Sequence, residues 1–301
     1  MSPIAKDVLP YESHSMSVGD HQLRYLDEGP NDATETILCV HGNPTWSYYF
    51  RSVVDRFKDR YRVVAVDHLG CGRSDKPPED QFGYRLSDHR DNLIKLIQQL
   101  DLTRVNLLAH DWGGAIGLAA MVRCQERVSR IALLNTGAFP PPYLPLRIAA
   151  CRWPVVGPLG VRGLNLFARA AVPMAMSRNR LTAEAAAGLL APYDSWRNRV
   201  AINAFVRDIP MNRAHPTHAA LESLESQLSA LRSRPIVLVW GMKDWCFRPE
   251  CLQRFESHWP EATAVRIPDA GHYVLLDAPE ETLQAIEEHL SRSSDDADTD
   301  G

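Results

Sequence analysis

The chain has 301 residues, of which 45% are hydrophobic and 23% are charged. This composition excludes a disordered or collagen-like chain, and the length suits one large core with one insertion. The formal net charge of −4 and the isoelectric point near 6.3 exclude an attraction to nucleic acid that acts over the whole chain. We therefore expect one enzyme-sized unit.

The N-terminus has no apolar run after a basic start, so we expect no signal peptide and a cytoplasmic protein. Residues 149–176 are apolar, but arginines and prolines interrupt them too often for a membrane-spanning helix. The six cysteines show neither zinc-ligand spacing nor a dense disulfide framework. We expect free thiols, no metal and no cofactor.

In chain order, the first predicted elements are two alternating stretches at 14–18 and 22–27, which indicate an edge hairpin with a turn at Gly19-Asp20. Short apolar runs typical of buried parallel strands follow at 36–40, 62–66, 105–109, 131–134, 236–240 and 264–267. Helix-period segments lie at 87–100, 114–124 and 249–259. This alternation predicts an α/β fold with a mostly parallel sheet of eight strands.

The alternation of strands and helices is interrupted once, at 136–215, where the sequence is helical and rich in proline. We predict a helical lid there, a core made of 1–135 and 216–290, and a disordered acidic tail at 291–301. The lid segment contains ten arginines, no lysine and three acidic residues, a net charge of +7, which leaves −11 for the rest of the chain.

Asp111 follows an apolar strand and precedes a predicted helix, in the pattern Ala-His-Asp-Trp-Gly. Small residues two positions before and after a reactive residue are typical of the nucleophile elbow, a strained turn that lifts one side chain above the sheet. An alternative is that Asp111 only caps the helix, because aspartate is a favoured capping residue.

Two further residues favour the catalytic interpretation of Asp111. Asp244 follows the strand at 236–240, and His272 follows the last strand, so the order is nucleophile, acid, histidine. No Asp or Glu occurs between 131 and 183, so only Asp244 can be the acid that orients His272. A purely structural role is the alternative for each residue.

The turn His-Gly-Asn-Pro at 41–44 follows the first central strand, where a backbone N–H can contribute to an oxyanion hole. Asn43 and Trp112 add an amide and an indole N–H, two donors that can bind a leaving anion. A simple turn is the alternative for this segment.

The segments HGNPTWSYYFR, DHLGCGRSDKP, AHDWGGAIGL and DAGHY together resemble the haloalkane dehalogenase branch of the α/β-hydrolases. The resemblance implies that Asp111 is the nucleophile, His272 the base and Asp244 the acid, and that Asn43 and Trp112 bind the leaving group. An acid after the seventh strand with an Asn–Trp pair resembles the subgroup that includes the β-lactone decarboxylases of bacterial long-chain olefin synthesis. Trp46 favours the same subgroup.

This resemblance implies decarboxylation of cis-3,4-dialkyl β-lactones to cis-alkenes and CO2. The first alternative is a haloalkane dehalogenase. An epoxide hydrolase is a further alternative, because it needs two lid tyrosines and the lid contains Tyr143 and Tyr193. A fold of this class that binds without catalysis is the last alternative.

The resemblance also has consequences for partners. The apolar lid could line pockets for a substrate with long alkyl chains, although ordinary packing of the lid predicts a similar composition. We expect the arginine-rich lid to dock an acidic partner, which fits the family's tendency to work in multienzyme complexes, here with other enzymes of olefin biosynthesis. No nucleic acid is expected.

Overall fold

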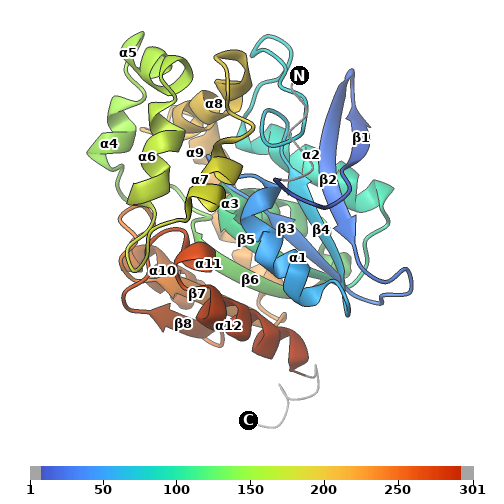
Figure 1. Cartoon of the computed structure of the whole chain (residues 1–301). Helices are drawn as coiled ribbons and strands as arrows, with labels where there is room; N and C mark the ends of the chain where they lie inside the picture. The colour runs from blue at the N-terminus through green and yellow to red at the C-terminus, as the bar shows by residue number, and fades with distance from the viewer. Residues whose placement is uncertain (1–7, 293–301) are drawn as a thin grey trace.

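The computed structural model describes residues 8–292 and arranges them around one mixed β-sheet (Figure 1). The strands are β1 (His14–Val18), β2 (His21–Glu28), β3 (Thr36–Val40), β4 (Arg62–Asp67), β5 (Val105–Asp111), β6 (Val128–Thr136), β7 (Ile236–Gly241) and β8 (Thr263–Ile267). Their order is β1-β2-β4-β3-β5-β6-β7-β8. β2 runs antiparallel to β1 and β4, and the other neighbouring pairs are parallel. The predicted fold class is confirmed.

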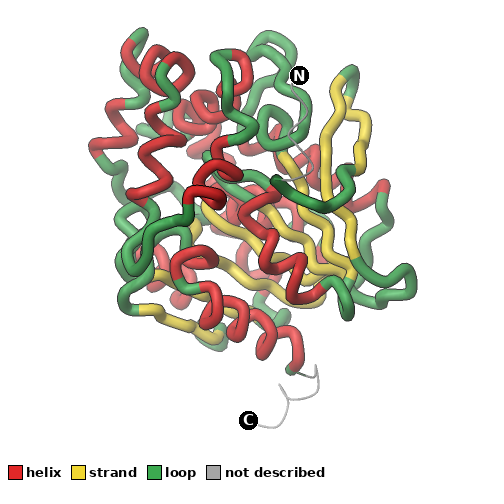
Figure 2. The backbone as a smooth tube through the Cα atoms, viewed as in Figure 1, coloured by secondary structure: helices red, strands yellow, loops and turns green. Residues whose placement is uncertain are grey.

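Helices cover both faces of this sheet, as Figure 2 shows. One face carries α2 (Leu86–Gln99), α3 (Trp112–Met121), α9 (Pro216–Gln227), η5 (Leu228–Leu231) and α10 (Pro249–His258), and the short exposed η2 (Gln125–Arg127) precedes β6. The other carries η1 (Ser47–Phe50), α1 (Arg51–Phe57), α11 (Val274–Asp277) and α12 (Pro279–Ser291). In β3, Leu38 and Val40 join the first apolar cluster and Ile37 and Cys39 the second, because successive strand residues point to opposite faces.

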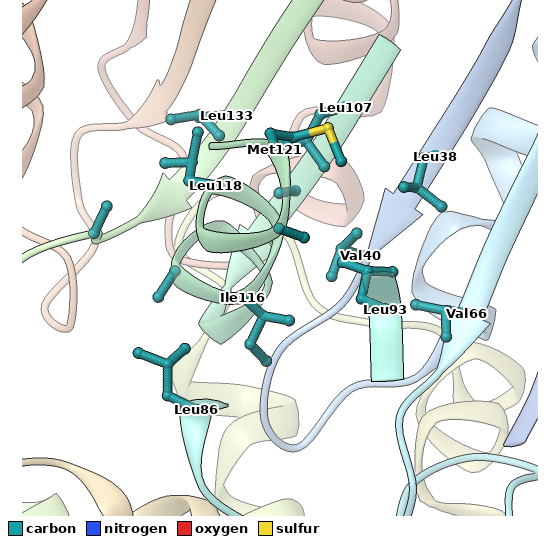
Figure 3. Close-up of a cluster of buried hydrophobic side chains, with 14 of the residues drawn as sticks. Leu38, Val40, Val66, Leu86, Leu93, Leu107, Ile116, Leu118, Met121 and Leu133 are labelled. Carbon is teal, nitrogen blue, oxygen red and sulfur yellow. The ribbon is translucent and has the colours of Figure 1, made fainter. Parts of the chain in front are cut away.

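The first apolar cluster fixes α2 and α3 on the central strands. Figure 3 shows Leu93 of α2 and Ile116, Leu118 and Met121 of α3 beside Leu38, Val40, Val66, Leu107 and Leu133 of four strands. Each fully buried side chain of this kind contributes roughly 1.5–3 kcal/mol. β3, β5 and β7 are buried along their whole length. The sheet is therefore a well-packed support for the residues at its carboxyl edge.

β6 is longer than the sequence pattern predicts. The apolar run covers 131–134, whereas the strand covers Val128–Thr136. Arg130 Nε donates to the His289 carbonyl at 3.1 Å, and Asn135 Oδ1 accepts from the Gly241 N–H at 2.8 Å. Because these polar side chains have partners inside the fold, the strand continues beyond the apolar run. Thr136, the first residue of the predicted lid segment, belongs to β6.

Between β6 and α9 the chain forms a helical insertion, called the lid below. It contains α4 (Leu146–Ala150), α5 (Val156–Pro158), η3 (Leu159–Gly163), α6 (Leu166–Met174), α7 (Ala183–Leu190), η4 (Arg197–Arg199) and α8 (Val200–Asp208). Of the predicted tail at 291–301, Ser291 ends α12, and residues 293–301 lie outside the described part. Within residues 8–292 all six cysteines are free, and no helix is long and apolar enough to cross a bilayer.

Candidate active site

Asp111 ends β5 at a sharp turn into α3. Its backbone angles, φ 55° and ψ −129°, are rare for a residue with a side chain. A Cβ on Gly42 would lie 2.0 Å from Asp111 Oδ1, and one on Gly113 would lie 1.9 Å from the Val40 carbonyl. The side chain of Asp111 makes no capping hydrogen bond to α3, which argues against the capping interpretation. The strained turn and its glycine neighbours have the geometry of a nucleophile elbow.

The structure brings His272 and Asp244 together beside Asp111. His272 Nδ1 lies 2.9 Å from Asp244 Oδ2, and Nε2 lies 3.6 Å from Asp111 Oδ2. An ionised carboxylate only accepts hydrogen bonds, so we assign the imidazole hydrogen to Nδ1, which leaves Nε2 directed at Asp111. The second distance is too long for a hydrogen bond. The three side chains thus have the arrangement of a catalytic triad.

Burial and neighbouring charges shift the pKa values of Asp111 and His272. It raises the pKa of Asp111, although His272 and the backbone N–H groups of Trp112 and Asn43 act in the lowering direction. Burial also lowers the pKa of His272, but the carboxylates of Asp244 and Asp111 outweigh it and leave that pKa raised. Asp111 is therefore more basic than an aspartate in water, and His272 is more readily protonated than a histidine in water.

Asn135 is a site residue that sequence reasoning missed. It is the penultimate residue of β6 and has φ 28°, and its Nδ2 donates to Asp244 Oδ2 at 2.9 Å and to the Gly241 carbonyl at 3.1 Å. The N–H of Cys246 donates to the other oxygen, Oδ1, at 2.6 Å. Asp244 is thus held from two sides while it faces His272. A polar residue at the end of an apolar strand run was the signal that could have identified Asn135.

Asn43 and Trp112 flank Asp111. The backbone N–H of Asn43 donates to Asp111 Oδ1 at 2.6 Å, so the two oxygens of the Asp111 carboxylate have different surroundings. Oδ2 faces His272 Nε2, which lies 3.6 Å away. The Asn43 amide donates only a long bond, 3.3 Å, to the Ile202 carbonyl. The Trp112 indole packs against Phe205 with ring centroids 5.6 Å apart.

Asp111 lines a cavity of about 320 Å³ between the carboxyl edge of the sheet and the lid. This volume is at the lower end for ligand pockets. The walls are mostly apolar and come from the core and the lid; they include Pro44, Phe139, Tyr143, Ile148, Leu166, Phe167, Met174, Val206, Ile209, Leu221, Trp245, Phe247 and Tyr273. Asn43, Trp112 and His272 also line it. The cavity suits a small polar group that carries apolar chains.

Three aromatic residues singled out by the sequence have different positions. Tyr143 lines the cavity, and its hydroxyl donates to the Cys246 carbonyl at 2.5 Å. Tyr193 does not line it; its buried hydroxyl donates to the Thr45 carbonyl at 3.1 Å. Trp46 is also outside the cavity, and its indole N–H donates to the Gly188 carbonyl of α7 at 3.1 Å. The two lid tyrosines therefore do not converge on Asp111.

The fold and this site define the class of the protein: residues 35–279 match the α/β-hydrolase fold family, and the chain belongs to it. Within that family the chain is haloalkane dehalogenase-like, as its motifs predict. A solved structure of the haloalkane dehalogenase DatA from Agrobacterium tumefaciens C58 shares the fold with a TM-score of 0.83 and 24% identity, covering 93% of this chain and 96% of that chain.

Two curated relatives are cis-3-alkyl-4-alkyloxetan-2-one decarboxylases. The one from Shewanella oneidensis is 34% identical over 95% of this chain and 90% of its own length. The one from Xanthomonas campestris pv. campestris is 38% identical, over 90% and 93%. Haloalkane dehalogenase 2 of Mycobacterium bovis is 31% identical, over 93% and 96%. The chain is related to both enzyme types and is more similar to these two decarboxylases than to this dehalogenase.

Proposed function

We propose that this protein decarboxylates cis-3,4-dialkyl β-lactones to cis-alkenes and CO2, with Asp111 as the nucleophile, His272 as its partner and Asp244 as the acid that orients His272. The observation that carries the proposal is that Asp111 lines an apolar cavity with its Oδ2 3.6 Å from His272 Nε2. The greater similarity to two β-lactone decarboxylases supports the choice of substrate.

The reaction begins when Asp111 Oδ2 attacks the ring carbon that bears the lactone oxygen, from the side opposite to that oxygen. The ring C–O bond breaks, and the lactone carbonyl becomes a free carboxylate β to the new ester. The bond to that carboxylate then breaks, CO2 leaves, its electron pair forms the alkene, and the Asp111 carboxylate departs. Backside opening followed by anti elimination keeps both alkyl chains on one side. No water, oxidant or net proton is needed.

The hydrogen bond from the Asn43 N–H to Asp111 Oδ1 supports attack at the ring carbon over attack at the carbonyl. Carbonyl attack would need the backbone N–H groups to bind the lactone oxygen. In the structure the N–H of Asn43 is bonded to Asp111 itself at 2.6 Å. In the ring-opened ester, Oδ1 becomes the ester carbonyl, and the same N–H makes Asp111 a better leaving group.

His272 has a different task under this proposal than in a hydrolase. With no water to activate, its raised pKa favours an imidazolium 3.6 Å from Asp111 Oδ2. That positive charge stabilises the carboxylate of Asp111 as the alkene leaves. Asn43 and Trp112 line the cavity, and under this proposal their amide and indole N–H groups bind the carboxylate released from the lactone.

A haloalkane dehalogenase is the second candidate, and the position of His272 Nε2 favours it. The first step is the same, with halide as the leaving group. Water activated by Nε2 would then attack the ester, whose Oδ1 accepts the Asn43 N–H. The epoxide hydrolase alternative has less support, because Tyr193 is bonded to Thr45 outside the cavity.

The test offers the purified protein a cis-dialkyl β-lactone, a 1-haloalkane and a terminal epoxide, and measures alkene with CO2, halide and diol. We expect alkene and CO2 from the lactone, and their loss in Asp111→Asn. Halide release without alkene would overturn the proposal in favour of the dehalogenase. The His272→Ala variant distinguishes hydrolysis of the ester from decarboxylation. Mass spectrometry should find an alkyl ester that persists on Asp111 after reaction with the haloalkane but not after reaction with the lactone.

The acidic partner expected for the lid stays a prediction. Five of the ten lid arginines are bonded within the protein; Arg152, for example, donates to the Val206 and Arg207 carbonyls at 2.5 and 2.8 Å. Arg199 donates to the carbonyls of Tyr193 and Arg162. Arg162, Arg178 and Arg207 are also bonded, to Trp196, Asp269 and Glu79 among others. Much of the lid charge thus stabilises the lid itself.

A further inference from the structure

One corner of the lid exposes an unusual set of apolar side chains. We call this set the lid crest; each member is between 53% and 86% exposed, and the members are Leu146, Trp153, Val155, Val156, Leu159, Leu164 and Leu166. They come from α4, α5, η3, the start of α6 and the turns between them, which occupy the corner labelled α4, α5 and α6 in Figure 1. Single exposed apolar residues are ordinary, but seven from 21 consecutive positions indicate a contact surface.

The backbone of the crest also indicates a contact surface. Val155 is 70% exposed and has backbone angles φ 64° and ψ −57°, and a positive φ is rare for a β-branched residue. Such strain persists only where the surrounding structure imposes it. Since an exposed valine gains little packing in return, the arrangement gives the free protein no evident stability and favours a use for the exposed side chain.

The segment that forms the crest carries only positive charges, although Glu79 of the core lies 3.7 Å from Arg162 within it. No acidic residue occurs between 131 and 183, whereas Arg147 and Arg169 are exposed beside the crest. The lid carries +7 and the rest of the chain −11. Near a negative surface this distribution attracts the lid and repels the core, so it selects one orientation.

The crest also adjoins the cavity. Leu166 is 53% exposed and Arg147 is exposed, yet both line the cavity that contains Asp111. The crest is dominated by leucine and valine, which are under-represented among the energetic centres of protein interfaces. Projecting aliphatic side chains with flanking arginines are instead suited to the headgroup region of a bilayer.

We propose that the lid crest docks on an anionic lipid surface, with its apolar side chains among the headgroups and its arginines beside lipid phosphates. Docking places the cavity opening near the bilayer, where a substrate with long alkyl chains resides. This delivery route rests on the proposed function, whereas the docking itself does not.

The experiment measures binding of the purified full-length protein to vesicles by flotation, with phosphatidylcholine alone and with phosphatidylcholine containing phosphatidylglycerol. We expect binding to the anionic vesicles that weakens as salt rises. The triple variant Trp153→Ser, Val156→Ser, Leu159→Ser alters only crest residues outside the cavity and should abolish it. Arg169→Glu should weaken it at least about 5-fold, since each arginine near an anionic membrane contributes about 1 kcal/mol.

Met211→Ser is the matched control, because Met211 is a 54% exposed lid residue outside the crest. It should bind vesicles like the unaltered protein, and circular dichroism should show the same fold for all variants. Absence of binding to anionic vesicles, or equal binding by the triple variant, would overturn the proposal. The proposal would also be overturned if the triple variant bound vesicles normally but lost a concentration-dependent dimer or a complex with an acidic protein. None of these readouts requires turnover of a lactone.

Discussion

The orientation of His272 depends on Asn135, which touches neither His272 nor the cavity. Asn135 Nδ2 and His272 Nδ1 both lie 2.9 Å from the same oxygen of Asp244. We predict that Asn135→Ala lowers kcat by about 10-fold with little change in KM, since a lost buried hydrogen bond costs ~1–3 kcal/mol. Steady-state kinetics on the substrate found by the panel above would measure this.

The control is Asn106→Ala. Asn106 is also a buried strand asparagine, and its Nδ2 donates to the carboxylate of Glu35 at 3.0 Å, near the opposite end of β5. The Asn106→Ala protein should lose about as much stability as Asn135→Ala but keep its kcat. Equal losses of kcat in both variants would show that Asn135 acts on stability and does not position Asp244.

The charge of Asp244 is predicted to set the pKa of His272. Burial lowers that pKa, and the carboxylates of Asp244 and Asp111 raise it by more. In Asp244→Asn the larger of the two raising charges is removed, so His272 should titrate at a lower pH than in the unaltered protein. NMR of the imidazole Cε1–H signal across a pH series measures this directly. A pKa that stays the same or rises in the variant would contradict the charge assignment.

At the scale of elements, apolar runs predicted β3 to β8 but not where several of these strands end. The runs at 36–40 and 236–240 coincide with β3 and most of β7, because these strands are buried on both faces. β5 continues to Asp111 and β6 to Thr136, since the polar residues at these ends are satisfied by site contacts. The missed residues are therefore at the site, where polar partners from distant segments decide the backbone.

The position of the lid could not be predicted from the sequence either. Its helical character was predictable from composition, but its contact with the core depends on pairs distant in sequence. Trp46 of the core donates to Gly188 of α7, and the Tyr48 ring stacks on Trp46 with centroids 5.5 Å apart. No periodicity in either segment indicates this pairing, so the sequence indicated Trp46 only through a family resemblance.

Gly188 is predicted to hold α7 against η1. A Cβ there would lie 2.2 Å from the Tyr48 ring. Gly188→Ala should therefore destabilise the protein by about 1–3 kcal/mol through overpacking, despite a helix-propensity gain of about 1 kcal/mol. Urea denaturation and limited proteolysis of the lid would measure the loss. Gly160→Ala is the control, because its Cβ meets only Leu166 at an ordinary 3.5 Å. If both variants were equally stable, the contact would not matter.

Across the whole molecule, five buried histidines make the fold sensitive to acid. Burial lowers the pKa of His89 to about 3 and of His289 to about 4, and it also lowers the pKa of His41, His68 and His110. Above pH 6.5 these groups are neutral in both folded and unfolded chains. Below it the unfolded chain takes up protons that the folded chain refuses, so stability falls. Asp208, whose pKa burial raises to about 6, acts in the opposite direction, as do Asp111 and His272, whose pKa values are also raised.

Removal of His89 is the most direct test of whether buried histidines make the fold sensitive to acid. It stacks on Phe205 with ring centroids 4.6 Å apart, and neither ring nitrogen has a hydrogen-bond partner within residues 8–292. We predict that His89→Leu unfolds at higher urea than the unaltered protein at pH 5, by more than at pH 8. The difference should grow by up to about 1.4 kcal/mol for each pH unit below 6.5, since one proton fewer is taken up on unfolding. Urea titrations at pH 8, 6 and 5 measure it. A difference independent of pH would mean that His89 is already charged in the folded chain or gains its charge equally in both states.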